Sequence, residues 1–499
     1  MLAKRRKRLY NNIVMNTQAI KEVNQENAIA ERERRQFVKM TQTPIARLII
    51  GLGIPTTLSM MVTSLYNLAD TFFVSMLGND SVTAAVSNLL ALMSIIQAIG
   101  FTYGMGSGSI VSRLLGKRDR EGADRVTSSA FFIALVSGLL ILTVGFIFFT
   151  PILKLLGSLD PEVLKYSKEY ARFILINAPF MCMSFVMNNV LRAEGKAVLS
   201  MIGLIAGALI NVALDPILIF GANLGVTGAA LATCISQIIS FCILLAMFLS
   251  GKTVVRLRVR SIAKTFKTYG EIIGTGFPSF CRQILASLCT VFLNQAAFTY
   301  GGNAGQASFG VVQKVFMLAF SLSLGIGQGY QPVLGYNYSA KRFERVRTAY
   351  LFTLFFSTCV MVAFAVVCAI FAPQIMQAFS LSEQATDYGT LTLRLQCICM
   401  PLLPLNFMSG ITYQTVGSKL IASILSVSRQ GLFYIPAVLF LPKLWKMFGV
   451  QCCQSVSDVC SFLFSIPFTL MFFKSLKQAE MDVKEDKEIG QVSSEIAFE

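Results

Sequence analysis

The sequence has no histidine and little charge: 14% of its 499 residues are charged and 54% are hydrophobic, with a mean hydropathy of +0.63. A soluble chain of this length needs a more polar surface, so the composition indicates a polytopic membrane protein. Without histidine no Ser–His–Asp triad can form. The 12 cysteines lack CxxC or CxxH spacing and are expected to be buried hydrophobes. We therefore expect no enzyme activity, no cofactor and no structural metal.

The sequence also lacks a nucleotide-binding motif. The one GKT, at residues 251–253, has Ala246 where a P-loop needs its first glycine, so we expect no ATP hydrolysis by this chain itself. The first 43 residues are polar, and we expect no signal peptide there. The net charge of +17 comes from the KRRKR run at residues 4–8 and from short loops. That placement favours contact with anionic lipid over binding of nucleic acid.

Apolar runs of membrane-spanning length occur about twelve times, and each must be a helix to satisfy its backbone in lipid. Their approximate cores are 46–76, 82–110, 126–149, 169–191, 198–220, 227–249, 270–299, 307–334, 348–372, 386–412, 420–441 and 451–473. Basic residues collect in the loops after even-numbered runs, which predicts a multi-pass protein of the plasma (inner) membrane with both termini in the cytoplasm. We expect the charged segment from Lys474 to be disordered.

The sequence contains an internal repeat. An offset of 223 residues places Gly53 on Gly276, Pro55 on Pro278 and Gly106 on Gly329. Each half has six helices, so we predict an all-α fold of twelve transmembrane helices in two lobes related by a parallel pseudo-twofold axis. Such repeats, with a site between the lobes, are typical of secondary transporters. The expected segments are a basic tail (1–43), an N-terminal lobe (44–250), a linker (251–269), a C-terminal lobe (270–474) and a cytoplasmic tail (475–499).

Two carboxylates interrupt the apolar runs of the first half. Asp70 lies in the first run, and Asp215 lies in the fifth with Asn211 at i−4 on the same helix face. Ionisable residues within membrane spans are costly and usually functional. Such a carboxylate can hold a proton or coordinate a hard cation, with amide and hydroxyl oxygens such as that of Thr233 completing the shell. The alternative is an inert polar contact between helices. At the repeat-related Pro436, the counterparts of Asn211 and Asp215 are Gly431 and Ile435, so the acidic pair belongs to the first half alone.

Other polar and adaptable residues in the runs are candidates for lining a substrate cavity. They are Met61, Met183, Met187, Arg282, Gln283, Asn294, Gln313 and Lys314. The methionines are equally explained as lipid-facing filler, and Arg282 and Lys314 as snorkelling or ion-paired side chains. A cavity lined by Arg282 and Lys314 would argue against a strongly cationic substrate. Three prolines inside the runs are candidate hinges: Pro55, Pro216 and Pro278. The glycines at residues 104–106 and 325–329 indicate either hinges or close helix packing.

These motifs together resemble the MATE (multidrug and toxic compound extrusion) transporters over about residues 45–475. The resemblance rests on GIPTTLSMMVTSLYNLADTFFVSMLG in the first run, LRAEGK after the fourth, ALINVALDPILIFG in the fifth and GFPSFCRQIL in the seventh. It implies an exporter of drug-like, cationic or amphipathic compounds that exchanges them against Na⁺ or H⁺ by alternating access. Carried over by position, it assigns a cation site to Asp70, Asn211, Asp215 and Thr233. It also implies a monomer that needs only a small-molecule substrate and the bilayer. The seventh-run acid of another branch is absent, because Arg282 and Gln283 occupy that region.

Three alternatives remain at this point. A lipid-linked oligosaccharide or polysaccharide flippase of the same superfamily would need a large cavity for an anionic headgroup. A channel or scaffold would give flux that ignores ion gradients. A membrane enzyme has no catalytic constellation to support it.

Overall fold

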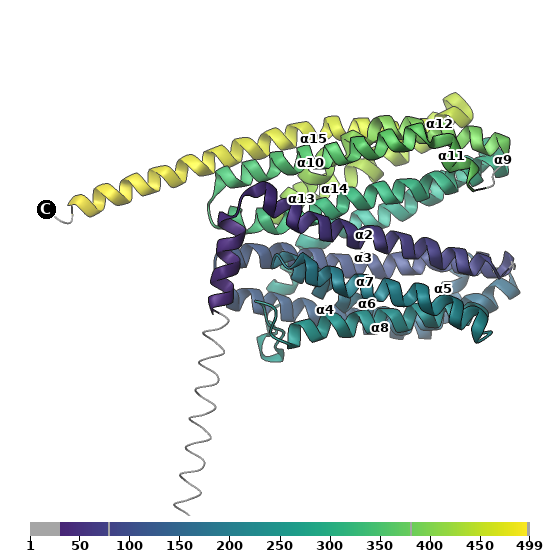
Figure 1. Ribbon diagram of the computed structural model, residues 1–499, viewed down its shortest axis with the longest axis horizontal. Helices are drawn as coiled ribbons and strands as arrows, with labels where there is room; N and C mark the ends of the chain where they lie inside the picture. The colour runs from purple at the N-terminus through teal and green to yellow at the C-terminus, as the bar shows by residue number, and fades with distance from the viewer. Residues whose placement is uncertain (1–29, 78–79, 380–381, 497–499) are drawn as a thin grey trace, which may run out of the picture.

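The computed structural model describes residues 30–77, 80–379 and 382–496, with the backbone alone at residues 67, 68, 71, 75, 80, 83 and 486–496. Figure 1 shows a bundle of long helices whose axes are roughly aligned. Beyond a first helix at residues 30–42, the elements of the N-terminal half are α2 (Ile45–Ser75), α3 (Asp80–Gly116), α4 (Arg120–Ile147), α5 (Phe149–Leu155), α6 (Pro161–Ala193), α7 (Ala197–Pro216), η1 (Ile217–Gly221) and α8 (Gly225–Leu249). After η2 (Val259–Ser261) come α9 (Phe266–Ser339), α10 (Phe343–Ile370), α11 (Ala372–Gln377), α12 (Glu383–Cys399), η3 (Met400–Leu402), α13 (Leu403–Val416), α14 (Lys419–Val427), η4 (Ser428–Tyr434) and α15 (Ile435–Ile496).

The helices cross the membrane twelve times. Ten continuous helical stretches in the described ranges are long and apolar enough to span a bilayer. One of them, α9, has 74 residues, and a straight helix of that length would extend about 110 Å, against a hydrocarbon core of roughly 30 Å. Its backbone turns at Gly302, where φ is 59°. The stretch from α14 into α15 turns in the same way at Trp445 and Lys446. Each of these two stretches therefore crosses twice, which confirms the twelve predicted spans.

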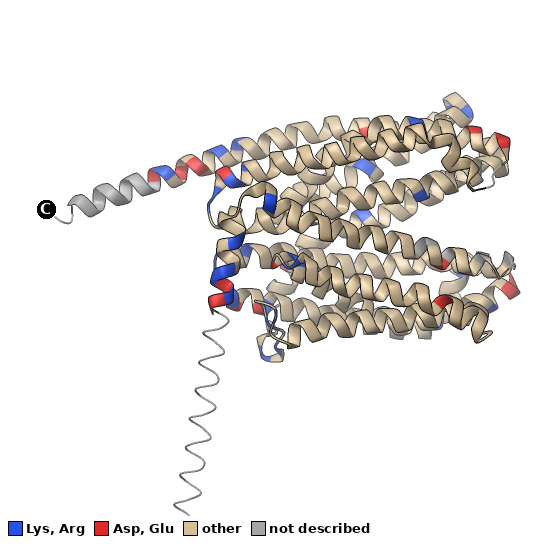
Figure 2. Ribbon diagram, viewed as in Figure 1, with Lys and Arg blue, Asp and Glu red and all other residues tan. Residues whose placement is uncertain are grey.

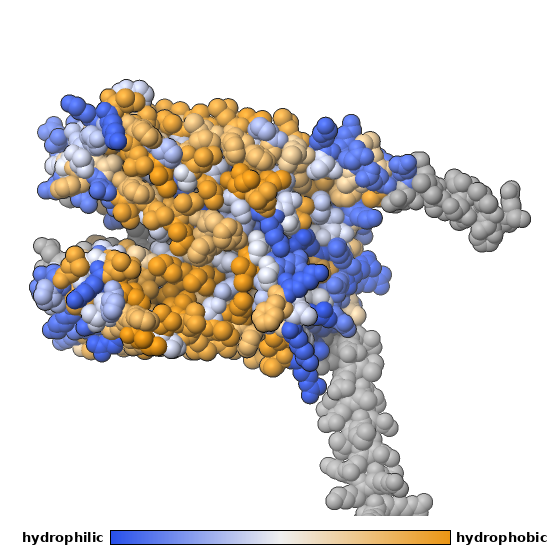
Figure 3. Space-filling model, turned by 180° about the vertical axis from the view of Figure 1, so that it is seen from behind, coloured by the Kyte–Doolittle hydropathy of each residue, from blue (hydrophilic) through white to orange (hydrophobic). Residues whose placement is uncertain are grey.

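The helices form two bundles that lie side by side. Figure 1 shows α2–α8, the N-terminal lobe, on one side and α9–α15, the C-terminal lobe, on the other. Lysine and arginine gather at the end of the molecule where residues 30–42 lie and from which the last turns of α15 extend (Figure 2). We call this the basic end; its segments include residues 30–42, 113–120, 251–265 and 339–347. Figure 3 shows, on the face it draws, an apolar band across both lobes and a gap between them at the opposite end. The lobes therefore meet toward the basic end and separate away from it.

Glycines bring the two lobes into direct backbone contact. A Cβ atom on Gly276 of α9 would lie 2.6 Å from the carbonyl carbon of Thr102 in α3. A Cβ atom on Gly329 would lie 2.5 Å from the Cα atom of Gly53 in α2. Gly106 meets α9 in the same way, close to the amide nitrogen of Gly276. The repeat offset of 223 residues relates Gly53 to Gly276 and Gly106 to Gly329. The Gly53–Gly329 and Gly276–Gly106 contacts are therefore equivalent under the pseudo-twofold axis. At these positions the glycines serve close packing between lobes.

Residues 30–42 lie across the basic end and bind both lobes. On the N-terminal side, the Gln36 amide donates to the backbone oxygen of Glu194 at 2.6 Å, and Arg118 stacks over the Phe37 ring at 4.3 Å. On the C-terminal side, the Asn337 amide donates to the backbone oxygen of Met40 at 3.0 Å. Arg342 and Arg345 donate to the neighbouring backbone oxygens of Thr41 and Thr43. This helix therefore joins the two lobes where they already touch.

The prediction of a disordered tail from Lys474 is wrong as far as the structure describes the tail, because α15 continues as helix to Ile496. The tail is rich in Lys, Glu and Gln, which are good helix formers. Pairs at i, i+4 spacing support the extension: Lys484 binds Glu480 at 3.2 Å, and Gln478 donates to Asp482 at 3.0 Å. Residues 497–499 lie outside the described residues.

Candidate cation and ligand sites

The polar residues predicted in the first half converge inside the N-terminal lobe. Asp215 and Asn211 lie one turn apart on the last turns of α7, and both are buried, with exposed fractions of 0% and 1%. Pro216 ends α7, and the chain continues as the π-helix η1. Proline and a π-helical turn both interrupt the regular backbone hydrogen bonds of an α-helix, so the Asp215 carboxylate lies at a break in the helix. Pro55 and Pro278 lie inside α2 and α9, and their role as hinges stays a prediction.

Hydrogen bonds connect four helices at this position. The Asn211 amide nitrogen donates to Thr233 Oγ1 of α8 at 3.3 Å. The Tyr170 hydroxyl of α6 lies 3.5 Å from Asp70 Oδ2 of α2 and also interacts with Thr233. One residue that the sequence did not single out, Tyr170, therefore bridges the two halves of the proposed cation site. The structure thus brings α2, α6, α7 and α8 together around Asp70 and Asp215.

Several oxygens in this cluster have no hydrogen-bond partner among the described residues. They are both carboxylate oxygens of Asp215, Oδ1 of Asp70 and Oδ1 of Asn211, and all four atoms are buried. A buried acceptor without a donor costs about 1–3 kcal/mol, and more if it is charged. The described residues supply no Lys or Arg within ion-pair distance of either carboxylate, and the two carboxylates act electrostatically on each other. This arrangement is chemically suited to a proton or to a hard cation held by oxygen ligands.

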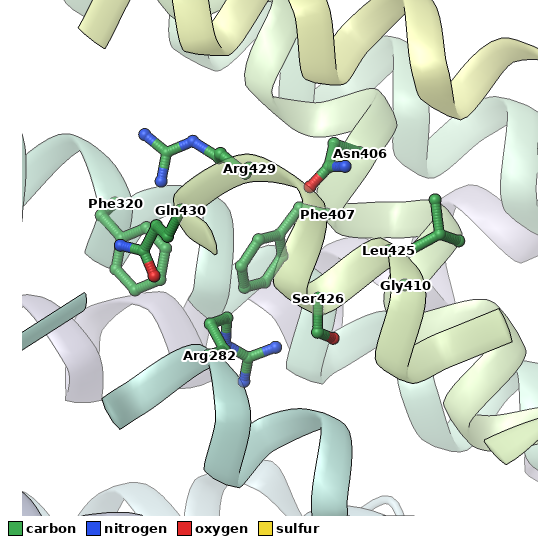
Figure 4. A pocket seen from close by; sticks show the side chains of 9 residues that line it. All are labelled: Arg282, Phe320, Asn406, Phe407, Gly410, Leu425, Ser426, Arg429 and Gln430. Carbon is green, nitrogen blue, oxygen red and sulfur yellow. The ribbon is translucent and has the colours of Figure 1, made fainter. Parts of the chain in front are cut away.

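The C-terminal lobe contains a cavity of different character. It is small, with a volume of about 20 Å³, and Figure 4 shows its lining side chains. Arg282 of α9 and Arg429 of η4 both line it, with Phe407 of α13 between them in this view. Arg429 Nε binds Asp458 Oδ1 of α15 at 2.8 Å, and both residues are buried. Arg282 is half-buried and donates to Ser279 Oγ at 3.5 Å.

The other predicted cavity residues are spread over both lobes. Met183 and Met187 are buried in the apolar core of the N-terminal lobe. Lys314 lies over the Phe379 ring at 5.5 Å. The remaining four are half-buried on α2 and α9: Met61, Gln283, Asn294 and Gln313. Their contact with substrate stays a prediction.

Sequence reasoning missed the buried Arg429–Asp458 ion pair. A signal was present, because each residue interrupts a predicted apolar core, 420–441 or 451–473. The sequence alone does not show that two charges on different helices face each other. Tyr170 gave no such signal, because tyrosine is common near the ends of apolar helices. Only the packing of α6 against α8, together with the reach of the Tyr170 side chain to Asp70 of α2, shows where its hydroxyl lies.

Comparison with known proteins identifies the family of the chain. The family profile described as MatE matches residues 55–217 and 278–439, one match in each lobe. The multidrug export protein MepA of Staphylococcus haemolyticus is 28% identical over 429 residues, which cover 86% of this chain and 94% of that protein. MepA of Staphylococcus aureus (strain MSSA476) is 26% identical over 419 residues, covering 83% and 91%.

Solved structures of similar chains have the same architecture. An outward-facing multidrug resistance MATE family transporter of the MOP superfamily superposes with a TM-score of 0.84 at 27% identity, covering 88% of this chain and 98% of the other. A MOP superfamily transporter from Pyrococcus furiosus, described as having a binding pocket of reverse polarity, gives 0.83 at 27% identity with the same coverage. Because the profile matches both lobes and covers more than half of the sequence, this chain belongs to the MatE family of membrane transporters.

Proposed function

We propose that this chain is a secondary active multidrug exporter, which exchanges drug-like compounds, cationic or amphipathic, against Na⁺ or H⁺ by alternating access. The coarser activity, export of multiple drugs, is supported by the MepA relatives and the MATE structures of similar fold. These relatives do not favour the flippase alternative. With the basic end in the cytoplasm, as the distribution of Lys and Arg predicts, the gap between the lobes opens to the outside (Figure 3).

The observation that carries the coupling proposal is the set of unpartnered oxygens in the N-terminal lobe. Asp215, Asp70 and Asn211 present four buried acceptor atoms without donors among the described residues. A proton on one carboxylate, or a cation between the carboxylates, would relieve their mutual repulsion and satisfy these atoms. The carboxylate and amide ligands come from α2 and α7, Thr233 adds a hydroxyl from α8, and Tyr170 ties Asp70 to α6. Loading and release therefore alter the contacts of four helices at once.

Coupling requires that ion and drug prefer different states of the same protein. In our proposal, the ion binds more tightly when α2 and α7 hold the two carboxylates close together. A drug that favours the other arrangement then promotes release of the ion, and the reverse holds by linkage. Asp70, Asn211, Asp215 and Thr233 are the proposed cation ligands, and Tyr170 orients Asp70. The candidate hinges for the change between the two states are Pro55, Pro216 and Pro278.

The test is transport by the purified full-length chain in proteoliposomes. Movement of a fluorescent cationic drug would be followed under an imposed Na⁺ gradient and, separately, under an imposed pH gradient. We expect one gradient to drive the drug and Asp215→Asn to abolish that drive. Asp387→Asn, which removes a carboxylate from α12 in the other lobe, is the matched control and should behave as the parent protein. Drug movement that ignores both gradients, or that survives Asp215→Asn, would refute the proposal.

A further inference from the structure

The guanidinium of Arg282 lies deep in the membrane with no carboxylate to neutralise it. Arg282 is 16 residues beyond the start of α9, which places it roughly 24 Å along the helix. An arginine side chain cannot reach either surface from that depth, so snorkelling does not account for it. None of the ion pairs in the described part of the chain includes Arg282. An unpaired charge at this depth is costly and is retained where it serves a function.

The charges around the cavity do not balance. Arg282 and Arg429 contribute two positive charges, and Asp458, bound to Arg429, contributes one negative charge. Arg429 is only 7% exposed, yet its Nη2 atom is buried without a hydrogen-bond partner among the described residues. The Gln430 side-chain oxygen is unpartnered in the same way, although as an acceptor it cannot bind an anion directly. The cavity therefore carries one excess positive charge and free guanidinium donors.

The rest of the lining is aromatic and neutral. Phe320 and Phe407 meet edge to face, with ring centroids 5.4 Å apart, and Arg282 lies over the Phe407 ring at 5.1 Å. Ser426 and Asn406 add small polar groups (Figure 4). The space that a water-sized sphere can occupy is about 20 Å³, far below the roughly 300–1,000 Å³ of a pocket that encloses a whole ligand. The cavity itself thus has room only for a small group such as the oxygens of an acid, and the rest of a bound acid would lie outside it.

We infer that the C-terminal lobe holds a binding site for organic anions, in which Arg282 receives the carboxylate of an organic acid beside the Phe320–Phe407 pair. This inference rests on the proposed function and narrows it: substrates that carry an acidic group are bound in the C-terminal lobe, while the cation site occupies the N-terminal lobe. Arg429, already paired with Asp458, contributes its free Nη2 donor. Guanidinium and carboxylate form charge-assisted hydrogen bonds that are stronger than neutral ones.

The test compares two probes of the same shape. Binding of 1-naphthoate and of neutral 1-naphthamide to the full-length chain would be measured by calorimetry in phosphatidylcholine nanodiscs. We expect naphthoate to bind at least about tenfold more tightly than naphthamide, and Arg282→Gln to remove that difference while leaving naphthamide binding unchanged. Arg394→Gln, which removes an arginine from α12 outside the cavity lining, is the control and should keep the difference. Equal binding of the two probes, no binding of either, or selectivity that survives Arg282→Gln would overturn the inference.

Three further measurements address the role of Arg429, the identity of the occupant and the proposed transport in turn. Because Arg429→Gln alone would leave Asp458 buried and unpaired, the double variant Arg429→Gln/Asp458→Asn is used, and it should weaken naphthoate binding only. Loss of naphthoate binding in nanodiscs that contain phosphatidylglycerol would show a lipid headgroup as the occupant and overturn the assignment to small acids. Gradient-driven drug transport by the same preparation tests the proposed function separately. Transport without selective naphthoate binding refutes only the anion site, and selective binding without transport refutes only the exporter.

Discussion

Replacing Gly276 by alanine tests the close contact between the lobes most directly. The added Cβ would lie 2.6 Å from the carbonyl carbon of Thr102, whereas non-bonded carbons pack at about 3.5–4.0 Å. The backbones of α3 and α9 would have to separate by about 1 Å at this point. The neighbouring atoms belong to the backbone of a packed helix, so they cannot move aside as a side-chain tip can. We expect the substitution to cost about 1–3 kcal/mol or more of stability.

The matched control is Gly270→Ala in the same helix. Gly270 is exposed, and a Cβ atom there would meet nothing within 4 Å. Alanine is the better helix former by about 0.5–1 kcal/mol, so this variant should be unchanged or slightly more stable. The two glycine-to-alanine changes are therefore expected to shift the melting temperature in opposite directions. The measurement is thermal unfolding of both purified variants in one detergent, followed with a thiol-reactive dye.

A melting temperature for Gly276→Ala equal to that of Gly270→Ala would refute this account of the interface. The repeat supplies a second check, because Gly106 meets α9 at the symmetry-related position. Gly106→Ala should destabilise the protein by an amount similar to that of Gly276→Ala. In transport assays, both variants should favour the state in which the lobes part at the basic end, and so slow the cycle.

Three further predictions concern buried polar groups. Asp458→Asn should lower stability by about 3–5 kcal/mol because it leaves Arg429 charged and unpaired, whereas Arg429→Met/Asp458→Leu should restore most of the loss in the same melting assay. Burial raises the pKa of Glu194 above its ordinary value of 4.5, and the opposing effect of Lys196 is smaller, so the folded protein binds this proton more tightly than the unfolded chain does. Stability should therefore fall as pH rises from about 4.5 through the raised pKa, and Glu194→Gln should flatten the dependence of melting temperature on pH in that range. Thr233→Val removes the acceptor for the Asn211 amide and should weaken coupling-ion affinity by about 2- to 12-fold in ion-dependent transport, with unchanged melting temperature as the control.

Much of the fold could be predicted from the sequence because hydropathy acts over whole helices. Each span has a run of apolar residues, and the glycine and proline pairs reveal the repeat without any contact information. The cation site could be approached because Asn211 and Asp215 lie four residues apart on one helix. Tyr170 could not be found in this way, since its relation to Asp70 depends on where the fold places α6 relative to α2. The helical tail beyond Lys474 shows that local helix propensity prevailed over a composition typical of disorder.

The first described helix has a consequence for how the protein is made. Residues 30–42 emerge early in synthesis, but their partners Asn337, Arg342 and Arg345 follow about 300 residues later, which at 5–20 residues per second is a delay of roughly 15–60 s. Met40, which is fully buried in the finished molecule, packs beside Gly195 of the N-terminal lobe, but the hydrogen bond from Asn337 to its backbone oxygen forms only after that interval. The nascent helix can therefore bind the first lobe early and lacks its partners on the C-terminal side until the second lobe has been inserted. Substitutions in this helix should therefore reduce the yield of assembled protein at the ribosome and membrane before they alter the turnover of molecules that have already folded.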